Sequence, residues 1–278
     1  MPSDLYEKYL AVLKATPFKG RAMPYDWGNL PNEMSFHWMA YAEMFREFSQ
    51  ELANSINDLT RFTHQLAAWR DVAGGVDEDG KFDIAHEFVD PLGTITLNLP
   101  YVIRSRFIFA AAHLSHQANM TKAMKGWKDD LPLDDEIYLE QAQTTGAPWK
   151  AWSKLKTKLE RISDRKYQAR TRNFRNTYNH RFSPRLVFGL TNSVTRHVDA
   201  KTGSVSYGFG GTPPLGLDLV VELLEAECQN CYRAFEAFQK LVREQEVAIA
   251  ASSARALAAM ATDSSPKLEP HAQETTKA

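Results

Sequence analysis

Apolar side chains recur at steps of three and four residues between positions 32 and 69, and this pattern restricts the fold more than any other feature of the chain. On a helix with about 3.6 residues per turn such positions share one face, so the segment predicts one long helix with a continuous buried stripe. The stripe consists of Tyr41, Phe45, Phe48, Leu52, Ile56, Leu59, Phe62, Leu66 and Trp69.

Helical periodicity recurs along most of the remaining chain. The other expected helices cover residues 3–15, 100–124, 134–144, 148–180 and 217–248. Pro184 forbids any continuation of the fourth of them. The segment 17–33 is rich in Pro, Gly and Asn and predicts a loop, and 74–83 predicts a turn.

A β-hairpin is expected between the last two long helices, within about 185–211. This segment is rich in β-branched and aromatic residues, and Val205, Tyr207 and Phe209 alternate after the turn-forming sequence "DAKTG". The chain therefore predicts a mainly α fold, a four-to-five-helix bundle with a β-hairpin inserted before the last long helix. We expect one domain over residues 1–250 and a disordered tail over 251–278, which has few large apolar side chains.

Composition is ordinary for a globular protein, with 278 residues, 44% of them hydrophobic and 24% charged. The first residues lack the basic start and apolar core of a signal peptide, and no apolar run approaches the roughly 20 residues that span a bilayer. Cys228 and Cys231 are the only cysteines, so no disulfide framework is expected. A cytoplasmic protein without a membrane partner is the expectation.

The charge is unevenly distributed. The chain has a net charge of −1, but residues 150–185 contain twelve Lys or Arg and two acidic residues, a local balance of +10. The rest of the chain therefore carries −11. One strongly cationic element on an acidic body is typical of a surface that steers a polyanion to one place, although a solvated helix face has the same composition.

Two motifs could bind a metal. Cys228 and Cys231 have a suitable spacing, but both lie on the apolar stripe of a helix and no second pair exists, which favours buried structural cysteines. His113 and His116 are one helical turn apart and could bind a metal with a third ligand such as His64 or His86. This metal-binding helical bundle is kept as an alternative, without a strict motif to support it.

The basic segment contains "NFRNTYNHRF", in which Arg175 is followed directly by Asn176 and, five positions on, by His180. Arg106 and His113 are seven positions apart and satisfy a looser form of the pattern, with four to six residues between Arg and His, but apolar residues separate them and no local excess of cations exists there. This Arg-x4-His motif, with a polar residue after the arginine, resembles that of the HEPN superfamily. The resemblance extends to the helical bundle and to the position of the motif near the end of a main helix.

Active HEPN proteins are metal-independent endoribonucleases, so the resemblance implies RNA as the substrate, no cofactor and no metal. His180 would exchange protons with the RNA 2′-OH or the leaving oxygen, since a histidine titrates near neutral pH. Arg175 would stabilise the charge of the transition state, and Asn176 would orient a phosphate oxygen or the histidine. The other expected RNA contacts are Arg172, Tyr178, Arg181 and Arg185. The products would be a 2′,3′-cyclic phosphate and a 5′-hydroxyl.

Five residues apart on an ideal helix, Arg175 and His180 point about 140° away from each other. They can meet if the helix unwinds near His180 or if a second chain contributes. The family usually dimerises with both motifs facing one cleft, so the resemblance implies a homodimer, and also a toxin or defence effector with a cognate inhibitor protein. The alternative from a different class is a non-catalytic HEPN-like module that binds RNA, nucleotide or protein.

Overall fold

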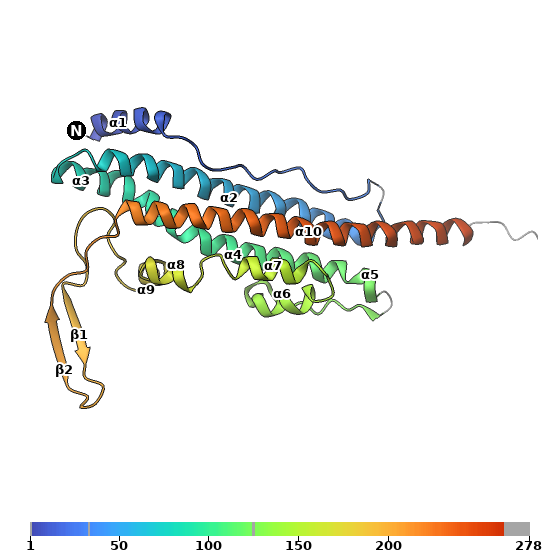
Figure 1. Cartoon of the computed structure of the whole chain (residues 1–278). Helices are drawn as coiled ribbons and strands as arrows, with labels where there is room; N and C mark the ends of the chain where they lie inside the picture. Colours follow the sequence, from blue (N-terminus) through green and yellow to red (C-terminus); the bar gives the residue numbers. More distant parts are fainter. Residues whose placement is uncertain (1, 33, 124–125, 264–278) are drawn as a thin grey trace, which may run out of the picture.

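The structure, a computed structural model, describes residues 2–32, 34–123 and 126–263 (Figure 1). It is mainly α-helical, with one two-stranded β-hairpin before the last long helix, which confirms the expected fold class. Within these ranges, none of the helices combines the length and the hydropathy that crossing a bilayer requires.

Three long helices form the body of the molecule. They are α2 (Met39–Ala73), α4 (Asp90–Ala118) and α10 (Leu217–Asp263). Helix α4 packs against both α2 and α10, and α10 also packs against α2 (Figure 1). Their apolar stripes meet in one core, in which Phe107 of α4 and Phe238 of α10 are fully buried with ring centroids 5.7 Å apart. Burying each such side chain stabilises the fold by about 1.5–3 kcal/mol.

Helix α1 (Pro2–Ala15) lies against one end of α2, where Tyr9 stacks on Trp69 with ring centroids 4.3 Å apart. The following segment is a loop, as predicted for 17–33 in its described part, and it ends in a 3-10 turn at Phe36–Trp38. The loop runs along the bundle (Figure 1). Three carboxylates of α10 hold it there. Glu225 accepts from Lys19 at 3.2 Å, Glu236 accepts from Arg21 at 2.5 Å, and Glu246 accepts from the Asn29 backbone at 2.7 Å.

The prediction of a turn over 74–83 is wrong for most of that segment, which forms α3 (Glu78–Ile84). The Asp77 side chain caps this helix by accepting the Gly80 N–H at 2.9 Å, and two acidic residues follow in the first turn. A π-helical turn at Ala85–Val89 then leads directly into α4. Helix α4 thus begins about ten residues before the predicted start at 100, and Pro100 lies inside it.

The predicted basic helix over 148–180 is also wrong as one element. It is divided into α7 (Trp152–Leu159), α8 (Arg165–Arg170) and α9 (Phe174–His180). Left-handed backbone conformations separate the pieces, at Ser163 before α8 and at Arg172 and Asn173 before α9. None of these residues is glycine, so the residue type that most often adopts this conformation is missing from the breaks.

Shorter elements cover one side of α4. Helix α5 (Met120–Ala123) follows it, and α6 (Leu139–Gly146) packs on it after a 3-10 turn at Asp134–Glu136. The α6 helix confirms the expectation of a short helix in this region.

Helix α10 is longer than predicted. Residues 251–263 belong to it, which corrects the expected disordered tail over that part of 251–278. The segment is rich in alanine, the residue with the highest helix propensity, and this outweighs its lack of large apolar side chains. Residues 264–278 lie outside the part of the chain that the structure describes.

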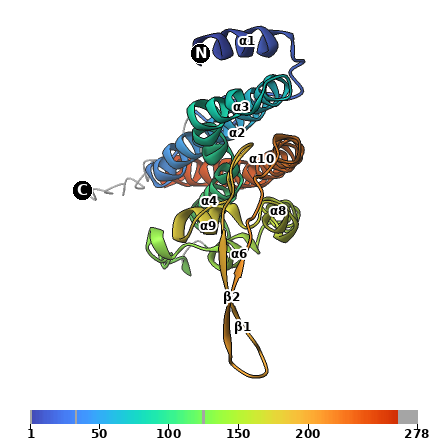
Figure 2. The same cartoon turned by 90° about the vertical axis from the view of Figure 1, so that its left-hand side faces the viewer.

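The hairpin consists of β1 (Val194–Val198) and β2 (Val205–Phe209), paired antiparallel from Val194↔Phe209 to Val198↔Val205. It extends away from the helices, as Figure 2 shows most clearly. Cross-strand partners point to the same face of the ribbon, so one face gathers an apolar set with a single cation. Its members are Val194, Arg196, Val198, Val205, Tyr207 and Phe209, all of which are exposed.

Candidate functional site

Helix α9 carries the Arg-x4-His motif on the surface of the bundle, beside α4. It begins after the two left-handed residues and ends when Arg181 adopts an extended conformation. The buried Phe174 anchors its first turn, and Tyr178 stacks on Phe174 with ring centroids 6.0 Å apart. Tyr178 itself is half exposed, so one side of its ring remains available to a ligand.

Arg175 lies on an aromatic ring of the neighbouring helix. Its guanidinium carbon is 3.2 Å from the centroid of the Tyr101 ring of α4, a cation–π contact that fixes the side chain while leaving it exposed. Among the described residues, no carboxylate forms an ion pair with Arg175. The positive charge of Arg175 is therefore not neutralised by an acidic side chain of the described residues.

A cavity of about 320 Å³ lies beside this contact. Both Arg175 and Asn176 line it, with Tyr101 as a wall. Two other lining groups are already engaged: the Tyr167 hydroxyl donates to the Leu97 carbonyl at 2.9 Å, and the Gln168 amide donates to the Ser163 carbonyl at 2.9 Å. Arg175 and Asn176 are among the lining side chains that form no side-chain hydrogen bond within the described residues. The cavity volume is at the lower end of ligand-binding sites.

His180 is exposed at the last position of α9 and does not line the cavity. Among the described residues its ring has no hydrogen-bond or ion-pair partner. The helix does not unwind before it, so of the two ways in which His180 could meet Arg175, unwinding or a second chain, the structure does not show the first. A single chain therefore brings together Arg175 and Asn176 but leaves His180 apart.

The three flanking arginines differ in their surroundings. Arg172 donates from its guanidinium to the Pro213 carbonyl, which fastens the break before α9 to the segment that precedes α10. The Arg185 charge lies near Asp90, where burial raises the pKa of the carboxyl and the guanidinium opposes that rise. Arg181 is exposed and has no side-chain partner in the described part of the chain. Arg181 is therefore the flanking cation most open to a phosphate.

A buried carboxylate of α10 holds the chain segment that leads to the motif. Glu227 of α10 accepts the Ser163 N–H at 2.8 Å and a hydrogen bond from Asn230 at 3.2 Å. Burial raises its pKa to about 7, because the charged form is poorly solvated there. The bond to Ser163 holds the left-handed turn that separates α7 from α8, so Glu227 fixes the path of the chain toward the motif.

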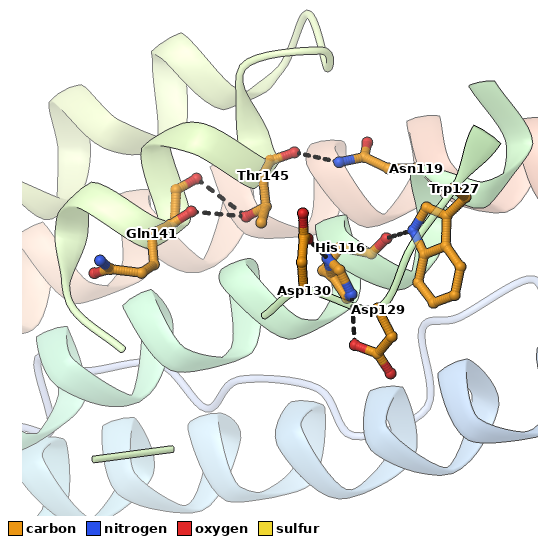
Figure 3. A network of polar contacts seen from close by, with 8 residues as sticks. His116, Asn119, Trp127, Asp129, Asp130, Gln141 and Thr145 are labelled. Atoms are coloured by element: carbon orange, nitrogen blue, oxygen red, sulfur yellow. Dashed lines mark hydrogen bonds and ion pairs between the residues drawn. The ribbon is translucent and has the colours of Figure 1, made fainter. Parts of the chain in front are cut away.

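The histidine pair of α4 is engaged elsewhere in the molecule, and Figure 3 shows the contacts of His116. Buried His116 meets Asp129 through Nε2 at 2.9 Å, and Trp127 donates to its backbone carbonyl at 3.1 Å. His113 lies 3.3 Å from Asp134, and burial lowers the pKa of its ring. Within the described residues, no group of three or more His, Cys, Asp or Glu side chains is placed to hold a metal ion. The described part of the chain therefore offers no ligand set for the metal-binding alternative.

The two cysteines are buried on α10 with free thiols, as the apolar stripe predicts. Burial raises the pKa of both thiols, so the reactive thiolate is disfavoured. They pack in the core and contribute no chemistry to the motif.

Two residues that matter to the site were missed in the sequence. Tyr101 and Glu227 come from helices distant in sequence from α9, and their roles follow from packing rather than from spacing. A tyrosine at the edge of the α4 stripe and a glutamate beside a cysteine carry no pattern that would single them out.

Comparison of this chain with protein-family models, with curated proteins and with solved structures found no match.

Proposed function

We propose that this protein is a HEPN-like, metal-independent endoribonuclease that acts as a homodimer. One observation carries the proposal: Arg175, held on the Tyr101 ring and free of any carboxylate partner among the described residues, lines a cavity together with Asn176. An arginine that is fixed, charged and open to solvent is suited to binding a phosphate.

In the proposed reaction the 2′-oxygen of a ribose attacks the adjacent phosphorus, and the bond from phosphorus to the 5′-oxygen breaks. One proton leaves the 2′-OH and one is delivered to the 5′-oxygen, giving a 2′,3′-cyclic phosphate and a 5′-hydroxyl. Arg175 stabilises the negative charge that builds on the phosphoryl oxygens. His180 takes up or delivers a proton, and Asn176 orients a phosphate oxygen.

A second copy of the chain completes the proposed site. His180 is exposed and does not line the cavity of its own chain, and a two-fold related copy can bring its His180 toward the Arg175 cavity. The apolar face of the hairpin supplies surface for such a contact. Phe209 on this face is 87% exposed, and Phe182, two residues after His180, is 85% exposed. Each such aromatic side chain can bury about 150–250 Å², a useful share of the roughly 800 Å² that each partner of a stable complex contributes.

The experiment is cleavage of single-stranded RNA by the full chain in EDTA, analysed for the end groups of the products. Wild-type protein should release 2′,3′-cyclic phosphate ends and leave DNA of the same sequence intact, because DNA lacks the nucleophile. Arg175→Ala and His180→Ala should each stop cleavage. The matched controls, Arg61→Ala and His86→Ala, alter exposed residues that do not line the cavity and should cut at the wild-type rate. Undiminished cleavage by both motif variants would refute the assignment.

A second candidate function is a non-catalytic HEPN-like module that binds RNA. The separation of His180 from the Arg175 cavity within one chain favours it. Saturable RNA binding that depends on Arg175 but not on His180, without any cleavage, would select this candidate.

A further inference from the structure

A second cavity, of about 700 Å³, lies next to the motif cavity. Residues of α2, of α4 and of the segment before α6 line it. Tyr101 belongs to the walls of both cavities, so the ring that holds Arg175 on one side also borders this larger space. A ligand bound at Arg175 and a group in the second cavity would therefore be neighbours.

Aromatic rings form much of the second cavity. Phe48 of α2 and Phe109 of α4 meet edge to face, with ring centroids 5.5 Å apart. Tyr138, at the N-terminal end of α6, is 66% exposed and stands at the rim. Flat apolar surfaces of this kind accept the face of a nucleobase, and stacking of a base on an aromatic side chain is tolerant of base identity.

Polar groups for the edge of a base are present as well. The Nε–H of Arg104 is buried and has no hydrogen-bond partner in the described part of the chain, and Arg104 lines the cavity. Because the Nε–H is closed to solvent, an acceptor on a ligand would meet the terminal N–H groups of Arg104, which form no hydrogen bond within the described residues. Arg106, by contrast, is already engaged, with its guanidinium on Ser55 and 3.3 Å from Glu51.

The two cavities differ in the charges of the residues that line them. Three acidic residues, Glu47, Glu51 and Asp134, line the second cavity along with its two arginines. A phosphate is disfavoured beside them, whereas carboxylates readily accept hydrogen bonds from the amino groups of bases. The motif cavity contains Arg175 and no acidic residue. The phosphate thus belongs with Arg175 and an uncharged, aromatic group belongs in the second cavity.

We propose that the second cavity binds a nucleobase of the RNA whose neighbouring phosphate contacts Arg175. Tyr101 separates the two subsites, Tyr138 stacks on the base, and Arg104 donates to an acceptor on its edge. This inference rests on the proposed binding of RNA at the motif, and it makes Arg104 and Tyr138 binding residues outside the motif.

The test is fluorescence anisotropy with a labelled 12-nucleotide single-stranded RNA of mixed sequence, in EDTA, on full-length His180→Ala protein so that cleavage does not interfere. Adding Tyr138→Ala or Arg104→Gln should weaken binding at least about fivefold, in line with the loss of one stacked or hydrogen-bonded base. Tyr138→Phe should retain the affinity, because the stacking surface remains. Tyr25→Ala and Arg61→Gln, matched changes that do not line the cavity, should bind within twofold of the parent.

The outcomes distinguish this inference from the function on which it rests. If Arg175→Ala abolishes binding while Tyr138→Ala and Arg104→Gln bind within twofold of the parent, the base-binding cavity is overturned and the proposed function stands. If the wild-type chain neither binds nor cuts RNA, both fail. If RNA binds in a manner that depends on Arg104 and Tyr138 but is never cut, the inference stands for the non-catalytic module.

Discussion

The histidine at the end of α9 and the buried histidine of α4 show two opposite uses of the same side chain. His116 is enclosed, with a side chain only 6% exposed, and its ring nitrogens lie near Asp129 and Asp130. His180 is exposed and has no side-chain partner among the described residues. The His116 network ties the chain after α4 back onto the bundle (Figure 3), so it serves stability. His180 holds nothing in place, which leaves it available to a ligand or a second chain.

The prediction with the largest expected effect tests this comparison by measuring the RNA cleavage rate and the folding stability of a His180 variant together. His180→Ala should lower the rate of RNA cleavage by about 10²–10⁴-fold, the usual contribution of a general acid or base. Its free energy of unfolding should change by less than about 0.5 kcal/mol, because the side chain is exposed and has no partner among the residues that the structure describes. Initial rates and urea denaturation of the same preparation provide the measurement. If the activity fell only in proportion to the loss of stability, His180 would have a structural role and not a catalytic one.

The second prediction concerns the buried carboxylate beneath the site. Glu227 has a folded pKa of about 7 against an ordinary value of 4.5, so the folded chain binds the proton more tightly than the unfolded chain. The free energy of unfolding should therefore fall as the pH rises from 4.5 to 7 and level off above that, by roughly 3 kcal/mol in all.

Glu227→Gln keeps an acceptor for the Ser163 N–H but cannot ionise, so it should remove this part of the pH dependence and be more stable than wild type at pH 8. Denaturant titrations of both proteins between pH 4.5 and 8 give the comparison. Identical pH profiles for the two proteins would show that ionisation of Glu227 is not the source of the pH dependence of stability.

The third prediction concerns His116, for which we expect a loss of stability without a loss of activity. His116→Ala should lower the free energy of unfolding by about 2 kcal/mol, since hydrogen bonds to charged groups contribute about 1.5–3 kcal/mol. RNA cleavage per folded molecule should be unchanged at a temperature where the variant remains folded. Asp130→Asn, which alters the exposed carboxylate 3.9 Å from the ring, is the mild control. A His116→Ala variant that is stable but inactive would contradict the division of roles.

The prediction with the smallest expected effect concerns the cation–π contact between Tyr101 and Arg175. Tyr101→Leu keeps an apolar side chain on α4 but removes the aromatic face under the guanidinium. A partly exposed cation–π contact contributes about 0.5–1 kcal/mol, so cleavage should fall only two- to fivefold. The reduction should appear for substrates of every sequence, because Arg175 binds a phosphate. An unchanged rate would mean that the ring does not position Arg175.

The sequence predicts the long helices well and their interruptions poorly. The stripe that runs from Tyr41 to Trp69 specifies α2, since every third or fourth residue must face the core. The breaks around α8 depend instead on Ser163, Arg172 and Asn173 adopting left-handed conformations, which tertiary contacts such as the Glu227 bond impose. Asp164, which caps α8 by accepting the Tyr167 N–H at 2.8 Å, is the one local signal that could have located the first break.

The motif residues could be identified from spacing and charge, but their relative placement could not. Arg175 and His180 diverge because α9 remains helical to its end, and the start of that helix is set by a break that periodicity does not reveal. The contribution of Tyr101 requires α4 and α9 to pack side by side, and this information is absent from either segment alone.

The length of α10 has a consequence for particle shape. At about 1.5 Å per residue, its 47 residues make a rod of about 70 Å, with the hairpin close to its first turn (Figure 1). Two chains joined through their hairpins, with the rods pointing apart, would reach up to about 140 Å from tip to tip. Solution scattering would separate so elongated an assembly from a side-by-side pair without any knowledge of the substrate.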